Sequence, residues 1–177
     1  MKPYCILILI IYILVPLTCS QYLNTGINFG TGRTPLHYAA ELGHVRIVEI
    51  LSHLMENPNV QDIVGETPMH CAAKTGKIEI VKILAQFWFK GNPNAQDKFG
   101  RTPIHYAARN GHIEVVEELL SLPLFSNPII PDNFGQTPID MADNFGHFYI
   151  SSLLLNVNNF LCDNSENSEP PSKKRKE

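Results

Sequence analysis

Cysteine and tryptophan are scarce in this 177-residue chain, which has four cysteines and one tryptophan. Two of the cysteines, Cys5 and Cys19, lie in an apolar stretch near the N-terminus, and no two are spaced as a C-x-x-C pair. So few cysteines exclude a disulfide scaffold, and the missing pair removes the usual spacing of a structural zinc site. The fold must therefore be held together by packing.

A large net charge is also absent, because the formal charge of the chain is −3 at pH 7. A chain of this charge has no general electrostatic attraction to nucleic acid or to an acidic membrane. The strongly basic run is local and consists of Lys173, Lys174, Arg175 and Lys176. We expect no direct binding of nucleic acid.

Familiar catalytic motifs are missing as well: there is no P-loop, G-x-S-x-G, H-E-x-x-H or dinucleotide-binding glycine pattern. Three histidines, His37, His70 and His105, recur in one register of a repeat. Equivalent helices would hold them ~8–10 Å apart, whereas zinc ligands lie about 2 Å from their metal. We predict that the chain is not an enzyme and uses no cofactor, metal or small-molecule substrate.

What the chain does contain is an internal repeat. Four stretches align, "GRTPLHYAAELGH", "GETPMHCAAKTGK", "GRTPIHYAARNGH" and "GQTPIDMADNFGH", with threonines at positions 34, 67, 102 and 137. Each threonine can cap a helix, and the proline after it suits the first helical position, where the missing N–H costs nothing. The alanine pairs favour helix and allow close packing, and the glycine of each stretch suits a left-handed helix end.

A second amphipathic helix is predicted after each stretch, in "VRIVEIL", "IEIVKIL", "IEVVEELL" and "FYISSLLL". Turn residues follow the first three, and Asp62, Asp97 and Asp132 each stand three residues before a glycine, as in a tight loop. The unit is therefore helix, turn, helix and loop.

These residues resemble the ankyrin-repeat pattern, in which T-P-L-H-x-A opens each repeat. The resemblance implies an all-α, ankyrin-repeat solenoid of helix–turn–helix units with β-hairpin loops. It places repeats at 29–61, 62–96, 97–131 and 132–158. The rest of the chain is divided into a signal peptide 1–20 that is expected to be cleaved, a linker 21–28 and a disordered tail 159–177 with the basic cluster. Asp140 replaces the motif histidine in the last repeat, which predicts a more polar closing face.

The resemblance also assigns roles to individual residues. It gives structural roles to the motif residues Thr34, His37, Thr67, His70, Thr102, His105 and Thr137, each histidine tying a loop to a helix. It places partner-binding positions on the loop tips and first helices, at Ile63, Val64, Glu66, Lys74, Lys98, Phe99, Arg101, Arg109, Asn110, Asn133, Phe134, Gln136 and Phe145. Phe99 and Phe134 share one register, and either form a stripe across a partner or fold back on their own loops.

The aromatic run "QFWFK", residues 86–90, is predicted to lie on an extended second helix of the second repeat. Such a cluster is typical of core between repeats. If Trp88 were exposed, it would instead mark an interface on the convex side.

The N-terminal segment has the layout of a secretory signal peptide: Lys2, an apolar run from Cys5 to Val15, then small residues before Gln21. The run is shorter than the ~20 residues that span a bilayer, so we expect no lasting membrane anchor. A retained signal-anchor and a wrongly assigned or cytosolic start are the alternatives.

The C-terminal tail combines polar residues with the basic cluster Lys173–Lys176. The cluster fits a nuclear localisation signal, a patch for anionic surfaces or a merely solvated tail. One interpretation combines both ends of the chain: it is secreted by one organism and binds a regulator inside the cells of another.

We therefore expect a monomeric protein–protein interaction module with a protein partner of unknown identity, secreted or in the ER lumen. The alternative is an intracellular regulatory adaptor of the nucleus or cytoplasm. An example of that alternative is a protein like the ankyrin inhibitors of NF-kappa-B, by analogy of fold alone.

Overall fold

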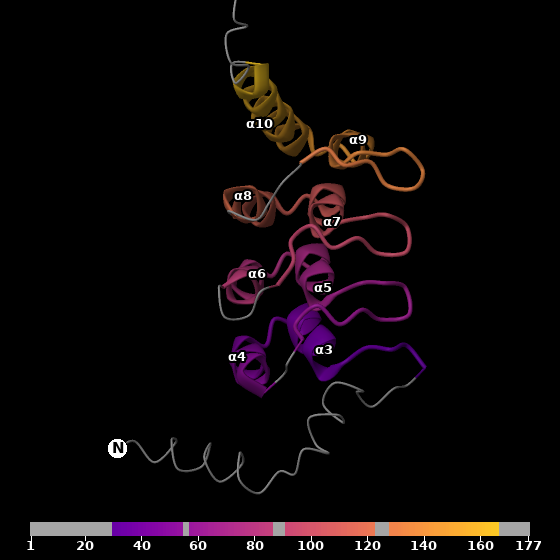
Figure 1. Cartoon of the computed structure of the whole chain (residues 1–177), viewed down its shortest axis with the longest axis vertical. Helices are drawn as coiled ribbons and strands as arrows, with labels where there is room; N and C mark the ends of the chain where they lie inside the picture. Colours follow the sequence, from indigo (N-terminus) through magenta and orange to yellow (C-terminus); the bar gives the residue numbers. More distant parts are fainter. Residues whose placement is uncertain (1–29, 55–56, 87–90, 123–127, 167–177) are drawn as a thin grey trace, which may run out of the picture.

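The computed structural model describes residues 30–54, 57–86, 91–122 and 128–166 (Figure 1). These residues form eight helices and no β-strand: α3 (Pro35–Leu42), α4 (Val45–Leu54), α5 (Pro68–Lys74), α6 (Ile78–Ala85), α7 (Pro103–Asn110), α8 (Ile113–Ser121), α9 (Pro138–Asn144) and α10 (Phe148–Glu166). The predicted all-helical solenoid is confirmed. None of these helices is both long and apolar enough to cross a membrane.

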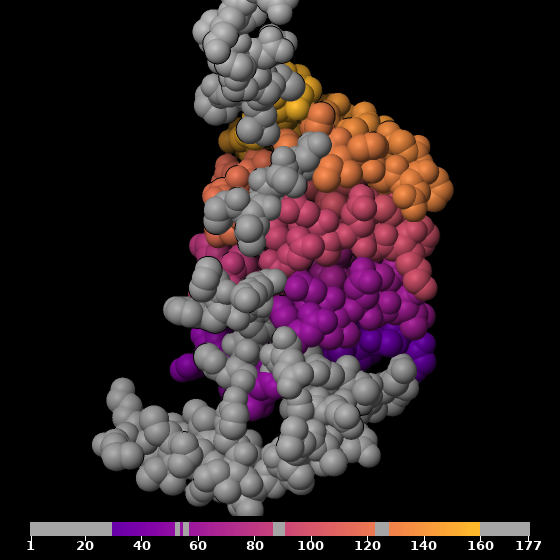
Figure 2. Space-filling view, in the orientation of Figure 1, coloured from indigo at the N-terminus to yellow at the C-terminus, as the bar shows by residue number. Residues whose placement is uncertain are grey.

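The helices form four pairs that stack one after another, with α3, α5, α7 and α9 in one layer and α4, α6, α8 and α10 in the other (Figure 1). Figure 2 shows the pairs as successive bands of one elongated body. Small residues let the inner helices approach closely, since Ala40, Ala73 and Ala108 are completely buried. Branched residues such as Val81, Val116 and Leu119 fill the space between the layers.

Each inner helix begins at a threonine that shares hydrogen bonds with the residue three positions later. In α7, Nδ1 of His105 accepts hydrogen bonds from the Thr102 backbone N–H at 3.0 Å and the Thr102 hydroxyl at 2.9 Å. α3 and α5 begin in the same way. In α9 the carboxylate of Asp140 accepts both bonds from Thr137 instead, at 2.8 and 2.6 Å. These contacts satisfy N–H groups that a helix start leaves without a partner.

The other ring nitrogen of each histidine faces the next loop. Nε2 of His37 donates to the carbonyl of Glu66, and Nε2 of His70 donates to the carbonyl of Arg101, both at 3.0 Å. Nε2 of His105 has no hydrogen-bond partner among the described residues. A carbonyl only accepts, so the hydrogen of His37 and His70 lies on Nε2 and leaves Nδ1 free to accept from threonine.

Removing one threonine hydroxyl should weaken the fold moderately. We expect Thr102→Ala to lower the free energy of unfolding by about 1 kcal/mol, because the helix start loses a buried hydrogen bond to His105. Urea unfolding followed by circular dichroism measures the change. The matched control is Ser121→Ala, which removes an exposed hydroxyl near the end of α8 and should change stability by a few tenths of that amount.

The structure adds detail to three local expectations. The loops contain no β-strand within the described residues and close as tight turns. Helix α6 ends at Ala85, and residues 87–90 of the aromatic run, Trp88 among them, lie outside the described residues. Helix α10 continues to Glu166, eight residues beyond the repeat boundary expected at 158.

The closing face of the stack is only partly polar. Asp140 and Asp143 are exposed on α9, as the sequence predicts. Helix α10 exposes the apolar residues Phe148, Tyr149 and Leu155 at the same end.

Candidate functional site

Tight loops project from the inner-helix side of the stack, and we call residues 62–66, 97–101 and 132–136 the three fingers (Figure 1). In each finger one oxygen of the leading aspartate accepts two backbone hydrogen bonds; Asp97 Oδ1 takes those of Phe99 and Arg101, both at 2.8 Å. The turn closes through the Gly100 N–H and the Asp97 carbonyl at 3.0 Å. Asp62 and Asp132 do the same in their fingers.

Neighbouring fingers are joined by backbone hydrogen bonds. Lys98 donates its N–H to the Val64 carbonyl at 3.0 Å, and Asn133 donates to the Phe99 carbonyl at 2.8 Å. Gly65 has φ +85°, and a Cβ placed there would lie 2.7 Å from the Lys98 nitrogen. Only glycine permits this approach, so the fingers form a fixed row.

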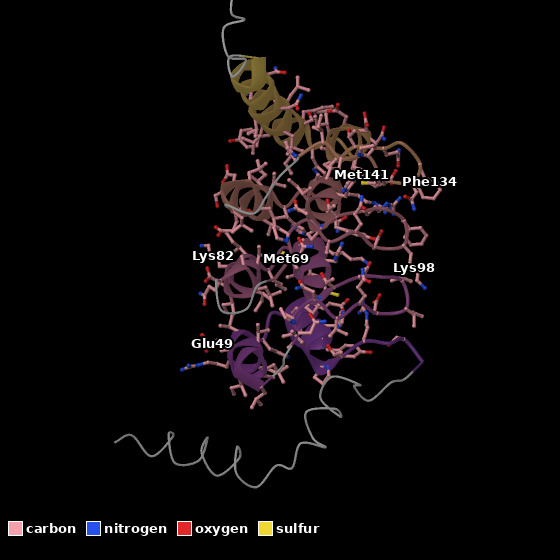
Figure 3. All side chains as sticks on the ribbon, in the orientation of Figure 1. Glu49, Met69, Lys82, Lys98, Phe134 and Met141 are labelled. Atoms are coloured by element: carbon pink, nitrogen blue, oxygen red, sulfur yellow. The ribbon has the colours of Figure 1, made fainter. Side chains whose placement is uncertain are left out.

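A groove of about 650 Å³ lies along the inner side of the fingers. Its walls come from the fingers, from helices α5 and α7, and from residues just before α3 and just after α9. The lining residues are Thr31, Arg33, Asp62, Ile63, Val64, Glu66, Lys74, Phe99, Arg101, Tyr106, Arg109, Asn110 and Phe145. Figure 3 shows Lys98 and Phe134 on the finger side and Glu49 and Lys82 on the opposite side, on the outer helices.

The part of the groove near α3 is an ion-pair network centred on Arg33. The guanidinium contacts Glu41 Oε2 at 2.6 Å, Asp62 Oδ2 at 3.2 Å and Glu66 Oε2 at 3.1 Å. Lys74 Nζ contacts the other oxygen of Glu66 at 2.9 Å. The exposure that the repeat register predicts for Glu66 is wrong, because the residue is 3% exposed and both of its oxygens are held inside the network.

Tyr106 and Cys71 occupy equivalent positions on the inner helices and are both buried. The Tyr106 hydroxyl donates to Asp97 Oδ2 at 2.6 Å, and Lys74 Nζ lies 5.2 Å from the centre of its ring. Burial raises the pKa of the Cys71 thiol to about 12. The thiolate that a nucleophilic cysteine needs is therefore disfavoured at neutral pH.

The part of the groove near α9 is aromatic. The Arg101 guanidinium lies 5.6 Å from the ring centre of Phe99 and 5.8 Å from that of Phe134, and its Nε contacts Asp132 Oδ2 at 3.1 Å. Phe99 is 42% exposed and Phe134 is 69% exposed. The two rings flank one arginine and remain open to solvent.

A second aromatic–cation contact lies deeper, on the inner helices. Arg109 of α7 lies 4.8 Å from the ring centre of Phe145, which is 54% exposed. Neither Arg109 nor Lys98 forms an ion pair with a described carboxylate, whereas Arg33, Lys74 and Arg101 all do. The positive charge left without a counter-charge is thus at the aromatic end.

The structure brings most of the predicted binding positions to one place. Ile63, Val64, Glu66, Lys74, Phe99, Arg101, Arg109, Asn110 and Phe145 line the groove. Lys98, Asn133, Phe134 and Gln136 lie on the fingers beside it. The basic cluster Lys173–Lys176 lies outside the described residues. Within the described ranges, no group of His, Cys, Asp and Glu could hold a metal ion.

Sequence reasoning missed Thr31, Arg33, Asp62 and Tyr106, which also line the groove. Arg33 could have been found from register, since it precedes its threonine as Glu66 and Arg101 precede theirs.

Stacked helix pairs with a row of short loops on one side define a helical-repeat scaffold. A family model described as ankyrin repeats matches the chain three times, at residues 8–91, 49–123 and 86–167. The chain belongs to the ankyrin-repeat family. Such repeats are generally protein–protein interaction modules and typically not enzymes. Comparison with curated protein sequences gave no match.

Proposed function

We propose that this chain binds a protein partner in the groove between its fingers and its inner helices. The observation that carries the proposal is the exposed aromatic set Phe99, Phe134 and Phe145, each held within 6 Å of Arg101 or Arg109. Aromatic residues and arginine are the types most enriched at the energetic centres of protein interfaces. Phe99, Arg101 and Phe134 stand on the fixed row of fingers, so binding costs little ordering of that part of the surface.

The charges of the groove indicate the kind of partner. Its carboxylates are already engaged by Arg33, Lys74 and Arg101, while Arg109 and Lys98 keep their charge for another molecule. A complementary partner presents acidic side chains next to apolar ones. Its apolar groups would contact the three phenylalanines and its carboxylates would approach Arg109.

The test compares two faces of the full-length chain. Proteins captured by the immobilised chain are purified, and their affinity is measured for wild type and for Phe99→Ala with Phe134→Ala. We expect at least a tenfold loss, because two interface aromatics are truncated. Glu49→Ala with Lys82→Ala changes the opposite face and should leave affinity unchanged. Equal loss from both variants, or no loss from the first, would contradict the proposal.

Charge reversal at Arg109 separates the partner's chemistry from binding itself. Arg109→Glu should reduce affinity by a further tenfold or more and should reduce the dependence of binding on salt. Isothermal titration at 50 and 500 mM salt measures both. Unchanged affinity with intact sensitivity to Phe99→Ala would leave the groove as the site but exclude an acidic partner.

We also propose a repeat number, an oligomeric state and a localisation for the chain. The four helix pairs are proposed to be four repeats of a monomer. If residues 1–20 are removed, the chain is secreted or enters the ER lumen. If they are retained, it acts as a regulatory adaptor in the cytoplasm or nucleus, with entry through Lys173–Lys176. N-terminal sequencing of the natural protein distinguishes the two, since Gln21 indicates removal and Met1 indicates retention.

A further inference from the structure

The N-terminal end of the stack is apolar and open. Tyr38 of α3 is 38% exposed, and Ile47 and Ile50 of α4 are 46% and 59% exposed. In the three later pairs, the positions equivalent to Tyr38 and Ile47 are at most 6% exposed. They are Cys71, Tyr106 and Met141 for the first, and Ile80, Val115 and Ile150 for the second.

The difference has a simple structural cause. Each later pair packs against the pair before it, through contacts of α5, α7 and α9 with the preceding inner helix and of α6 and α8 with the preceding outer helix. The pair α3–α4 has no such neighbour among the described residues. Tyr38 and Ile47 therefore mark a surface of the type that is buried at every other junction of the stack.

At the C-terminal end of the stack, the inner helix α9 carries carboxylates at positions that are buried and uncharged in the other inner helices. On α9, Asp140 stands where the buried histidines stand, and Asp143 stands where Ala40, Ala73 and Ala108 are completely buried. Terminal repeats need such a polar outer face for solubility. These two carboxylates also disfavour a second copy as the cover, because head-to-tail stacking would bury them without partners.

The segment that precedes α3 in the same chain fits the open end better. The first ankyrin match begins at residue 8, well ahead of Pro35. In the described pairs, the outer helix ends 13, 17 and 16 residues before the next threonine cap. The apolar run "LIIYILV" ends at Val15, 19 residues before Thr34, close to the position where an outer helix is expected.

We propose that residues 8–15 are retained in the working protein and cover the N-terminal end of the stack, as the outer helix of a preceding repeat does. The run carries no charge, as suits a segment placed on Ile47 and Ile50. Its apolar composition then serves packing, and the resemblance to a signal peptide is a consequence of that role. This inference is independent of the proposed groove.

The experiment is a double-mutant cycle in the full-length chain. A helix over residues 8–15 would place Ile10 and Leu14 on one face and Ile8 and Tyr12 on the other. Each pair is replaced by alanine, alone and combined with Ile47→Ala/Ile50→Ala, and unfolding in urea is measured. We expect one segment pair and the α4 variant to have non-additive effects on the free energy of unfolding. Replacing that same segment pair should also make amide hydrogen exchange in α4 about tenfold faster. Leu155→Ala, equally apolar but at the far end, is the control and should be additive with both pairs.

Alanine adds neither a charge nor a larger apolar side chain. These variants should therefore remain soluble, and the cycle can be interpreted. Additivity of both segment pairs with the α4 variant, and unchanged exchange in α4, would overturn the proposal. A natural protein that begins at Gln21 would overturn it as well. If residues 8–15 and α4 are not coupled, the affinity of the groove for a partner is unaffected. A negative result for this inference is therefore distinguishable from a negative result for the proposed function.

Discussion

Lowering the pH from 7 to 5 is expected to destabilise the folded chain through its three buried motif histidines, by about 2 kcal/mol from His105 alone. Burial lowers the pKa of His37, His70 and His105, in the case of His105 to about 4. All three side chains are completely buried, so bulk water cannot solvate their charged forms. The neutral ring is also required structurally, because Nδ1 accepts two hydrogen bonds from threonine.

The direction of the effect follows from proton binding. The unfolded chain takes up protons near the ordinary histidine pKa of about 6.5, whereas the folded chain resists until the pH is much lower. Protonation therefore favours unfolding, and stability that is complete above about pH 6.5 is lost as the pH falls toward the folded pKa. For His105 alone the loss by pH 5 is about 2 kcal/mol. His37 and His70 act in the same direction.

A single substitution isolates this contribution. His105→Gln keeps an acceptor at the third helical position, where glutamine forms the same capping box, but it cannot titrate. Urea unfolding of both proteins at pH 7 and pH 5 should show a pH effect about 2 kcal/mol smaller in the variant. Ser121→Ala, which removes an exposed hydroxyl and no titratable group, should keep the wild-type pH dependence. Identical pH dependence in wild type and His105→Gln would contradict the assignment.

The features that could be predicted from the sequence are those set by neighbours in the chain. Threonine followed by proline defines where each inner helix begins, and the structure starts α3, α5, α7 and α9 at Pro35, Pro68, Pro103 and Pro138. Gly111 ends α7 in the left-handed conformation, at φ +76°. These signals act within one turn of helix, so they are readable without knowing the fold.

The features that could not be predicted depend on residues about one repeat apart. The repeat register places Phe99, Arg101 and Arg109 on the side of the stack where they line the groove, yet it also places Glu66 on the surface. Glu66 is buried because Arg33, 33 positions earlier, and Lys74 both reach its carboxylate. Equivalent positions of a repeat can hold opposite charges, and only the fold shows which of them meet.

Loss of Arg33 should be the most damaging change on the finger side of the stack. We expect Arg33→Met to lower the free energy of unfolding by about 3–5 kcal/mol, the usual consequence of removing one partner of a buried ion pair. The side chains of Asp62 and Glu66 are 3% and 4% exposed. Without the guanidinium, Asp62 would keep a buried negative charge with no cation, and Glu66 would retain only Lys74.

Two comparisons separate this effect from a general loss of charge. Arg46→Met removes an arginine whose side chain is 92% exposed and which contacts Glu49 at 3.5 Å, so it should cost no more than about 0.5 kcal/mol. Adding Asp62→Asn to Arg33→Met removes the stranded charge and should recover part of the lost stability, because a neutral amide is far cheaper to bury than a carboxylate. Urea unfolding at pH 7 measures all four proteins. If Arg33→Met were no more destabilising than Arg46→Met, the three carboxylates around Arg33 would have to be solvated, and the network would not stabilise the groove.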